Sequence, residues 1–233
     1  MSERFYINCE LEPGPVEIEG TEAHHLAGVC RIRPGDRVCL FNGDGADYPA
    51  TVVEVAKKRV SLEVTERIPA VRELPFYLEL AVPLPKGDRA QFLVEKLTEL
   101  GVTTFVPLLC ERSVVEPKEG TIEKLRRYVI EASKQCGRNV LMKIGAPVTW
   151  TKYAAAREDE IRVFAHPGIG GSNEIPTGRI VRCVVGPEGG FTTGEVEHAR
   201  TCEWRGVDLG PRILRMETAA LAMALRAVAR IPV

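Results

Sequence analysis

From residue 76 onward the sequence alternates between short apolar segments and longer amphipathic ones, and this pattern restricts the fold more than any other feature. The apolar segments are typical of buried strands, and the longer segments repeat their apolar residues at helical spacing. Strands and helices in alternation indicate an α/β domain with a largely parallel sheet. The expected strands cover 76–84, 103–110, 161–166, 179–186 and 206–210, and the expected helices cover 88–101, 121–137, a segment opened by the capping pair Thr192 and Glu195, and 217–231.

Two of these helices carry recognisable packing faces. In the first, the stripe formed by Phe92, Leu93, Leu97 and Leu100 predicts a face buried against the sheet. In the last, the small residues from 219 to 229 predict close packing on a neighbouring element, for which a subunit interface is one candidate.

The first seventy residues follow a different pattern. Short β-type segments are separated by turn signals such as Pro34-Gly35-Asp36 and Asn42-Gly43-Asp44-Gly45. This spacing predicts a small β-barrel with one short helix near residues 21–32. Pro69 and Pro75 indicate a linker, so we expect a barrel domain over 1–72 and an α/β domain over 73–233.

Length and composition limit the class of protein. A chain of 233 residues that is 45% hydrophobic can bury a substantial core. The sequence contains no apolar run long enough for a signal peptide or a membrane span, so we expect a cytoplasmic protein without membrane contact. Its seven cysteines include no C-x-x-C pair and no histidine at ligand spacing, which predicts buried free thiols and no metal site.

The charge distribution is more informative than the net charge of -1. Residues 1–72 hold nine Lys and Arg against twelve Asp and Glu, whereas residues 112–152 hold nine Lys and Arg against four acidic residues. This asymmetry is compatible with a basic face for nucleic acid and equally with an ordinary solvated helix face.

Three glycine-containing turns, at 166–171, 186–190 and 209–212, follow three successive expected strands. Because ligands of open α/β sheets bind at the carboxyl ends of strands, three such turns together predict a pocket. Glu188 lies inside the second turn and would repel a phosphate, so the ligand is not expected to be a bare polyphosphate. We expect Gly189 to require a positive φ and therefore to exclude a β-branched side chain.

Four segments resemble one known family. They are KGDRAQFLVEKLTELGVTTFVPLLCERSVV, EASKQCGR, VVGPEGGFTTGEV and LGPRILRMETAAL, and HHLAGVCRIRPGD resembles the N-terminal domain of the same family. The chain is thereby identified as resembling the ribosomal RNA small subunit methyltransferase E family, the uridine-N3 methyltransferases of the SPOUT superfamily. The resemblance extends over nearly the whole chain, with the motifs in order.

The resemblance implies a PUA-like β-barrel for RNA binding, followed by a SPOUT α/β domain whose end is threaded into a trefoil knot. It also implies S-adenosyl-L-methionine as methyl donor, a homodimer, and methylation at N3 of a uridine in the decoding region of 16S rRNA in the assembled small subunit.

Residue roles follow from the matching motifs. Backbone groups at the glycines would bind the adenine edge of the donor, and Leu209, Ile213 and Leu214 would enclose its faces. The expected donor-binding residues are His166, Gly186, Glu188, Gly189, Gly190, Leu209, Gly210, Ile213, Leu214 and Thr218.

The chemistry requires removal of the N3 proton and stabilisation of negative charge on the uracil oxygens. Arg215 and Glu217, beside the donor loop, are the expected catalytic residues, although Glu217 could equally begin the last helix. The expected RNA contacts are Arg4, Arg31, Arg112, Arg127, Arg138 and Arg212.

Two alternatives remain open at this point. One is a non-catalytic assembly factor that binds rRNA through the barrel and the basic segment. The other is a methyltransferase of the same superfamily with a different RNA target.

Overall fold

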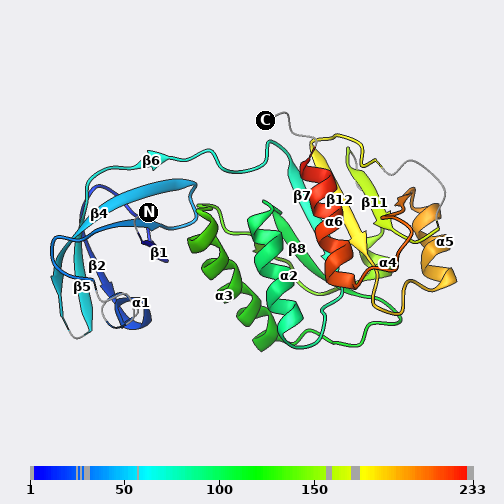
Figure 1. The fold of residues 1–233 in the computed structure, drawn as a ribbon, viewed down its shortest axis with the longest axis horizontal. Helices are drawn as coiled ribbons and strands as arrows, with labels where there is room; N and C mark the ends of the chain where they lie inside the picture. Colours follow the sequence, from blue (N-terminus) through cyan, green and yellow to red (C-terminus); the bar gives the residue numbers. More distant parts are fainter. Residues whose placement is uncertain are drawn as a thin grey trace. The chain divides into compact units, whose positions relative to one another are not determined.

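The computed structural model describes residues 3–24, 26, 28, 32–56, 58–155, 159–168 and 174–229 (Figure 1). The chain divides into two compact units, one made of 1–73 with 133–141 and the other of 74–132 with 142–233. The expected boundary at 72/73 lies within one residue of the first division. The expectation did not include 133–141, the end of a helix and the loop after it, in the first unit.

The first unit is a six-stranded sheet with the order β1-β3-β4-β5-β2, in which β6 pairs with β4. Pairing is antiparallel except between β1 and β3. Inward-facing residues of five strands form one core with Leu11, Ala23 and Leu26. The elements are β1 (Arg4–Tyr6), β2 (Gly14–Glu19), α1 (Gly20–His24), β3 (Arg37–Phe41), β4 (Ala46–Val55), β5 (Arg59–Val64) and β6 (Ile68–Pro69).

Hydrogen bonds join the segment 133–141 to the rest of the first unit. Asp47 accepts hydrogen bonds from Arg4 and from Arg72 at 2.7 Å each, and from the Asn139 amide at 3.0 Å. Arg4 also donates to the Asn139 side chain, and Arg72 donates to the carbonyl of Gly137 at 2.9 Å. Although partial burial opposes ionisation, these donors hold the pKa of Asp47 well below its usual range.

The second unit is a seven-stranded parallel sheet of order β10-β8-β7-β12-β11-β13, with β9 paired to β8. The expected strands are therefore present, while β9, β10 and α4 had no sequence signal. The elements are β7 (Tyr77–Val82), α2 (Asp88–Glu99), β8 (Thr104–Leu109), α3 (Glu119–Cys136), β9 (Lys143–Ile144), β10 (Val148–Thr149), α4 (Trp150–Tyr153), β11 (Ile161–Ala165), β12 (Ile180–Val185), α5 (Thr193–Thr201), β13 (Arg205–Val207) and α6 (Met216–Val228).

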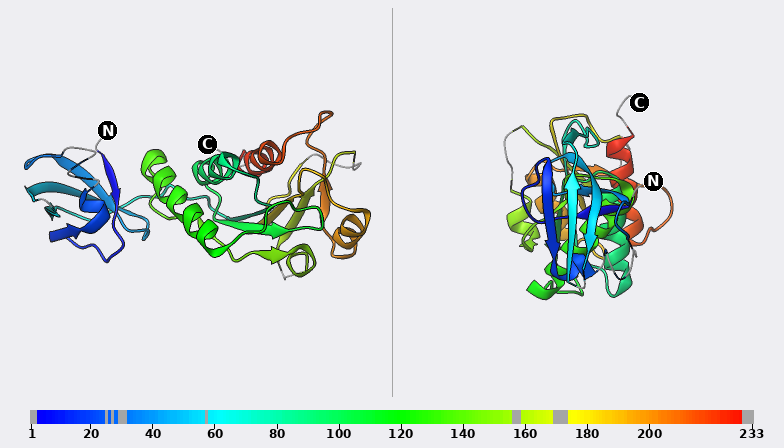
Figure 2. Two further views of the ribbon diagram at one scale, coloured as in Figure 1. Left: turned by 90° about the horizontal axis from the view of Figure 1, so that it is seen from below. Right: turned by 90° about the vertical axis from the view of Figure 1, so that its left-hand side faces the viewer.

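Helices cover both faces of this sheet (Figure 2). α2 and α6 contact each other, and α6 packs on β7 and β12, whereas α4 and α5 lie on the opposite face around an aromatic core that includes Trp150, Phe191 and Trp204. The chain thus returns from β13, at the sheet edge, to α6 over the middle of the sheet.

The predicted helix faces and caps are partly confirmed. The α5 capping box between Thr192 and Glu195 is present, with both reciprocal hydrogen bonds. In α2, Leu93 and Leu97 are buried as expected, but Phe92 is 44% exposed and Leu100 lies beyond the end of the helix. The buried face consists of Leu93, Val94, Leu97 and Thr98, and it therefore lies about one residue further along the helix than the expected stripe.

Candidate functional site

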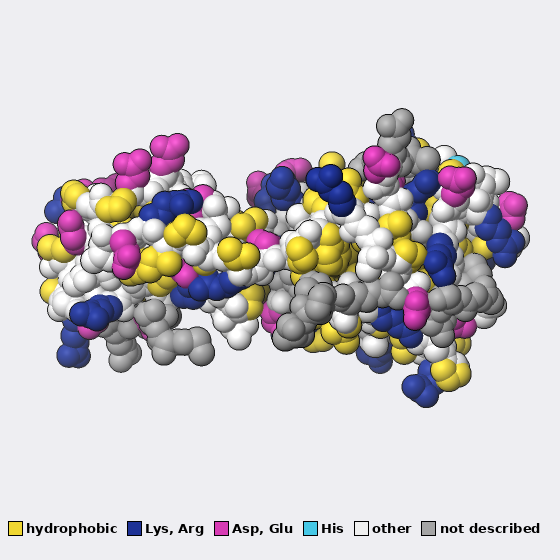
Figure 3. Space-filling model, turned by 90° about the horizontal axis from the view of Figure 1, so that it is seen from above, with side chains coloured by type: hydrophobic (Ala, Val, Ile, Leu, Met, Phe, Trp, Pro, Cys, Tyr) yellow, Lys and Arg dark blue, Asp and Glu magenta, His cyan; other side chains and the backbone are white. Residues whose placement is uncertain are grey.

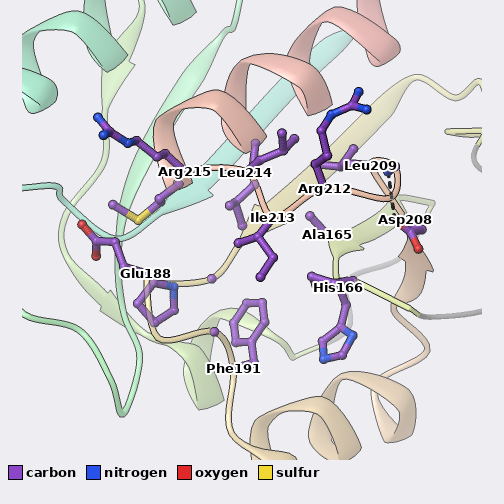
Figure 4. Close-up of a pocket in the computed structure, with 18 residues that line it drawn as sticks. Ala165, His166, Glu188, Phe191, Asp208, Leu209, Arg212, Ile213, Leu214 and Arg215 are labelled. Carbon is purple, nitrogen blue, oxygen red and sulfur yellow. Dashed lines mark hydrogen bonds between the residues drawn. The ribbon is translucent and has the colours of Figure 1, made fainter.

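A cavity of about 340 Å³ opens where three loops of the second unit meet (Figure 4). The loops follow β11, β12 and β13, which are neighbours in the parallel sheet, so their carboxyl ends lie together. The first turn of α6 completes the wall. The lining residues are Ala165, His166, Pro167, Val185, Gly186, Pro187, Glu188, Gly190, Phe191, Asp208, Leu209, Gly210, Arg212, Ile213, Leu214, Arg215, Met216 and Ala219.

The turn after β12 places glycines where a side chain would interfere. A Cβ atom on Gly186 would lie 3.0 Å from the ring of Phe191, and both residues line the cavity. Gly190 has a φ of 70°, and its N–H donates to the carbonyl of Pro187 at 2.8 Å. Left-handed backbone of this kind favours glycine.

The structure contradicts the expectation that Gly189 has a positive φ. The glycine of this turn with positive φ is Gly190, and Gly189 does not line the cavity. Its carbonyl accepts a hydrogen bond from Arg112 at 2.7 Å, and a Cβ atom on Gly189 would meet the Arg112 side chain at 3.2 Å. The sequence pattern identified the turn but could not distinguish two consecutive glycines with different backbone angles.

Apolar side chains form the floor and one wall of the cavity. Ile213 is 93% exposed and points toward Phe191 in Figure 4, while Leu209 and Leu214 are half-buried. Apolar side chains lining a concave site are typical of a small-molecule pocket.

Charged groups surround this apolar centre. Glu188 lines the cavity and forms an ion pair with Arg89 of α2 at 3.3 Å. Arg89 also lies 3.7 Å from Oε2 of Glu217, a buried carboxylate outside the lining. Arg212 and Arg215 line the cavity, but their guanidinium groups point away from Phe191 and His166 (Figure 4). Among the described residues, none forms an ion pair with Arg215.

His166 is the lining residue at the end of β11. Its ring packs edge-on against Phe164, with ring centres 6.1 Å apart, and its backbone N–H donates to Val207 at 3.0 Å. The buried Nδ1 atom has no hydrogen-bond partner within the described part of the chain.

Most of the expected donor-binding residues meet in this cavity. The exceptions are Gly189 and Thr218, because Thr218 lies on an exposed face of α6. Of the two expected catalytic residues, Arg215 lines the cavity and Glu217 does not. Sequence reasoning missed Phe191, Asp208 and Ala219, although Phe191 directly follows the glycine turn and Asp208 directly precedes Leu209.

The expected RNA-contacting arginines have different environments. Arg127 and Arg212 are exposed, Arg112 is bonded to Gly189, and Arg31 lies outside the described residues. On the face drawn in Figure 3, described Lys and Arg side chains are interspersed with Asp and Glu.

Arg4 and Arg138 differ from the expectation, because each is already neutralised. The Arg4 side chain is 15% exposed and paired with Asp47, and that of Arg138 is 4% exposed and paired with Glu73 at 2.6 Å. Contact with a phosphate would break a mostly buried ion pair. Because Asp47 and Glu73 are distant in sequence from Arg4 and Arg138, these ion pairs could not be predicted from the sequence alone.

The described cysteines are free, as expected, but their burial varies: Cys39 and Cys183 are buried, Cys9 is exposed and the other three are half-buried. Within the described ranges, no cluster of His, Cys, Asp and Glu is suited to hold a metal ion. The helices described are also too short or too polar to cross a membrane.

Comparisons with known proteins agree with this architecture. The family model described as an RNA methyltransferase domain matches residues 72–228, and the model described as an RNA methyltransferase PUA domain matches residues 18–65. The ribosomal RNA small subunit methyltransferase E of Bacillus subtilis is 34% identical over 240 residues, which cover 94% of this chain and 93% of that protein.

Two solved structures are similar over nearly the whole chain. One is a ribosomal RNA small subunit methyltransferase E from Neisseria gonorrhoeae bound to S-adenosylmethionine, with a TM-score of 0.88, 29% identity and coverage of 96% of this chain and 95% of that one. The other, from Legionella pneumophila and also in complex with S-adenosylmethionine, has a TM-score of 0.88, 29% identity and 96% coverage of both chains. The first unit is thus PUA-like and the second has the SPOUT-type α/β fold. The chain belongs to the ribosomal RNA small subunit methyltransferase E family.

Proposed function

We propose that the protein methylates N3 of a uridine in 16S rRNA of the assembled small ribosomal subunit, with S-adenosylmethionine as donor. The observation that carries this proposal is the cavity at the ends of β11, β12 and β13, in a chain that belongs to this family. Relatives that are 29% identical were solved with S-adenosylmethionine bound.

The lining chemistry suits this donor. The volume of the cavity, about 340 Å³, lies within the range of small-molecule pockets. Leu209, Ile213 and Leu214 would hold the faces of the adenine, and the backbone at Gly186, Gly190 and Gly210 would bind its edge. Glu188 would attract the positive charges of the donor. When bound, S-adenosylmethionine supplies an electrophilic methyl group.

Arg215 is the residue that we assign to the chemistry. Uracil becomes nucleophilic at N3 by losing its proton to solvent, and its negative charge then extends over the ring oxygens until N3 takes the methyl group and the donor leaves as a neutral thioether. Arg215 lines the cavity and forms no ion pair among the described residues, so its guanidinium is available to stabilise that charge. We assign Glu217 a supporting role instead, because its buried carboxylate faces Arg89, the partner of Glu188.

Calorimetric titration with S-adenosylmethionine tests the donor assignment. We expect one binding site per chain with micromolar affinity. The alternative of a non-catalytic assembly factor predicts no binding, and that result would contradict the proposal.

We further propose that Arg112, Arg127 and Arg212 contact the RNA phosphates. Arg127 is exposed on α3 and outside the donor cavity, so it tests the charge effect alone. Arg127→Ala should weaken RNA binding by a few fold at any sequence and reduce the salt dependence by about one counterion. Filter binding across a salt series measures both quantities. Glu123→Gln on the same exposed helix is the control, and equal weakening by both variants would argue against a phosphate contact.

A cytoplasmic homodimer is the form that we propose for the enzyme. The exposed apolar residues Phe92 on α2 and Leu225 on α6 lie on two helices that contact each other. Together with the half-buried Leu221 and Ala222, one turn before Leu225 on α6, they would form a self-complementary face. Sedimentation at micromolar concentration should give a dimer. A fully active monomer would contradict this part of the proposal.

A further inference from the structure

Asp208 connects two of the loops that line the cavity. Its Oδ2 atom accepts the backbone N–H of Gly168 at 3.0 Å, and its Oδ1 atom accepts the backbone N–H of Gly210 at 2.9 Å. Gly168 follows β11, whereas Asp208 and Gly210 follow β13, so one carboxylate joins loops that are forty residues apart in sequence. The bond to Gly210 is the dashed line beside Asp208 in Figure 4.

Asp208 is also hydrogen-bonded to the last helix, α6. The carbonyl of Asp208 accepts a hydrogen bond from Nη1 of Arg226 at 2.9 Å. Arg226 lies in α6, whose first turns supply Met216 and Ala219 to the cavity wall. Through its side chain and main chain, Asp208 therefore contacts each of the loops after β11 and β13 as well as α6.

The two glycines that donate to Asp208 have backbone angles that only glycine adopts without strain. Gly168 has a φ of 70° and Gly210 a φ of 118°, values that glycine adopts readily but that it leaves equally readily. Their neighbours His166, Pro167 and Leu209 line the cavity. A displacement of either glycine would move part of the wall.

We propose that Asp208 is a positioning residue: its carboxylate holds the loops after β11 and β13 together, so that the donor cavity is formed before the donor binds. A direct role in the reaction is not assigned, because both oxygens already accept backbone hydrogen bonds. The N–H groups of Gly210 and Gly168 lower the pKa of Asp208, which keeps the carboxylate ionised and in its stronger accepting form.

The effect on donor affinity rests on the proposed function, but the effect on the loops does not. Two measurements therefore separate them. Amide hydrogen exchange of the donor-free protein reports whether the N–H groups of Gly168 and Gly210 are protected by their hydrogen bonds to Asp208. Calorimetry with S-adenosylmethionine reports whether the cavity is preformed for the donor. The variants are Asp208→Asn, which keeps one accepting oxygen, and Asp208→Ala, which keeps none. Glu197→Gln, which alters an exposed carboxylate paired with Arg200 on α5, is the matched control.

We expect exchange at Gly168 and Gly210 to rise at least tenfold in Asp208→Ala and less in Asp208→Asn, with the control unchanged. Donor affinity should fall at least tenfold in Asp208→Ala and to an intermediate degree in Asp208→Asn. At saturating donor, kcat should remain within about threefold of wild type, because Asp208 takes no direct part in the reaction.

The possible failures have different meanings. Unchanged exchange at both glycines, or unchanged donor affinity in Asp208→Ala, would overturn the positioning role. If wild type binds no donor while exchange still rises in Asp208→Ala, the proposed function fails and the connection between the loops stands.

Discussion

Replacing Gly186 with valine is expected to lower the affinity for S-adenosylmethionine by roughly 100-fold, the upper end of the cost of overfilling a packed site. Gly186 directly follows β12 at the cavity, and even a single Cβ atom there would lie 3.0 Å from the Phe191 ring. The γ methyl groups of valine would force that ring to move or would occupy donor space themselves. Calorimetry on the purified variant measures the loss.

The control for this prediction is Gly120→Val. Gly120 is exposed in the first turn of α3, and a Cβ atom there would meet nothing within 4 Å. The control should bind the donor like wild type, and thermal melting should show that both variants are folded. Normal donor affinity in a folded Gly186→Val protein would mean that this cavity is not the donor site.

Replacing Arg215 with alanine is expected to reduce kcat by at least about 100-fold while donor and RNA affinities stay within a few fold of wild type. In the proposed reaction, charge on the uracil develops only during the transfer, so its stabilisation would contribute to the rate rather than to binding. Arg215→Lys should recover part of the rate, because it keeps the charge but loses the planar donor geometry. Single-turnover transfer of a labelled methyl group measures the rate.

Arg200→Ala provides the control for Arg215. Arg200 is an exposed arginine of α5 whose pair with Glu197 lies outside the cavity. Its loss should leave turnover unchanged. If Arg215→Ala turns over as fast as wild type, Arg215 has no catalytic role.

Much of the second unit could be predicted because its signals are local. Buried parallel strands give continuous apolar runs, and the turn glycines mark where those strands end. β12 and the glycine turn after it are an example, and so is the capping box of α5. By contrast, β9 and β10 are two residues long each, too short to leave a periodic pattern.

Interactions between distant residues could not be predicted in this way. Arg182 occupies a strand that reads as apolar, yet it is fully buried, paired with Glu79 at 3.1 Å and Glu160 at 2.7 Å, and stacked 4.0 Å from the centre of the Tyr153 ring. Nothing local distinguishes this arginine from one that is free to bind RNA. The same limit explains the expectation for Arg4, whose partners Asp47 and Asn139 lie 43 and 135 residues away.

The candidate site contains residues that could be predicted from the sequence and residues that could not. Eight of the ten expected donor-binding residues line the cavity, and all of these except His166 lie in motifs that are continuous in the chain. Motif resemblance could not assign the orientation of individual side chains, so Thr218 was expected in the cavity but faces outward, and Glu217 was expected at the reaction centre but faces Arg89. Helix phase in α6 decides both positions, and that phase depends on how the helix packs on β7 and β12.

The central claim, methylation of uridine at N3, is tested most directly by identifying the product nucleoside. Small ribosomal subunits that lack the modification are incubated with the protein and isotopically labelled S-adenosylmethionine, and their RNA is digested and separated by mass spectrometry. We predict that the label appears in N3-methyluridine at one position of 16S rRNA, and that Gly186→Val and Arg215→Ala each reduce it strongly. Label in any other nucleoside, or no transfer from a protein that binds the donor, would contradict the claim.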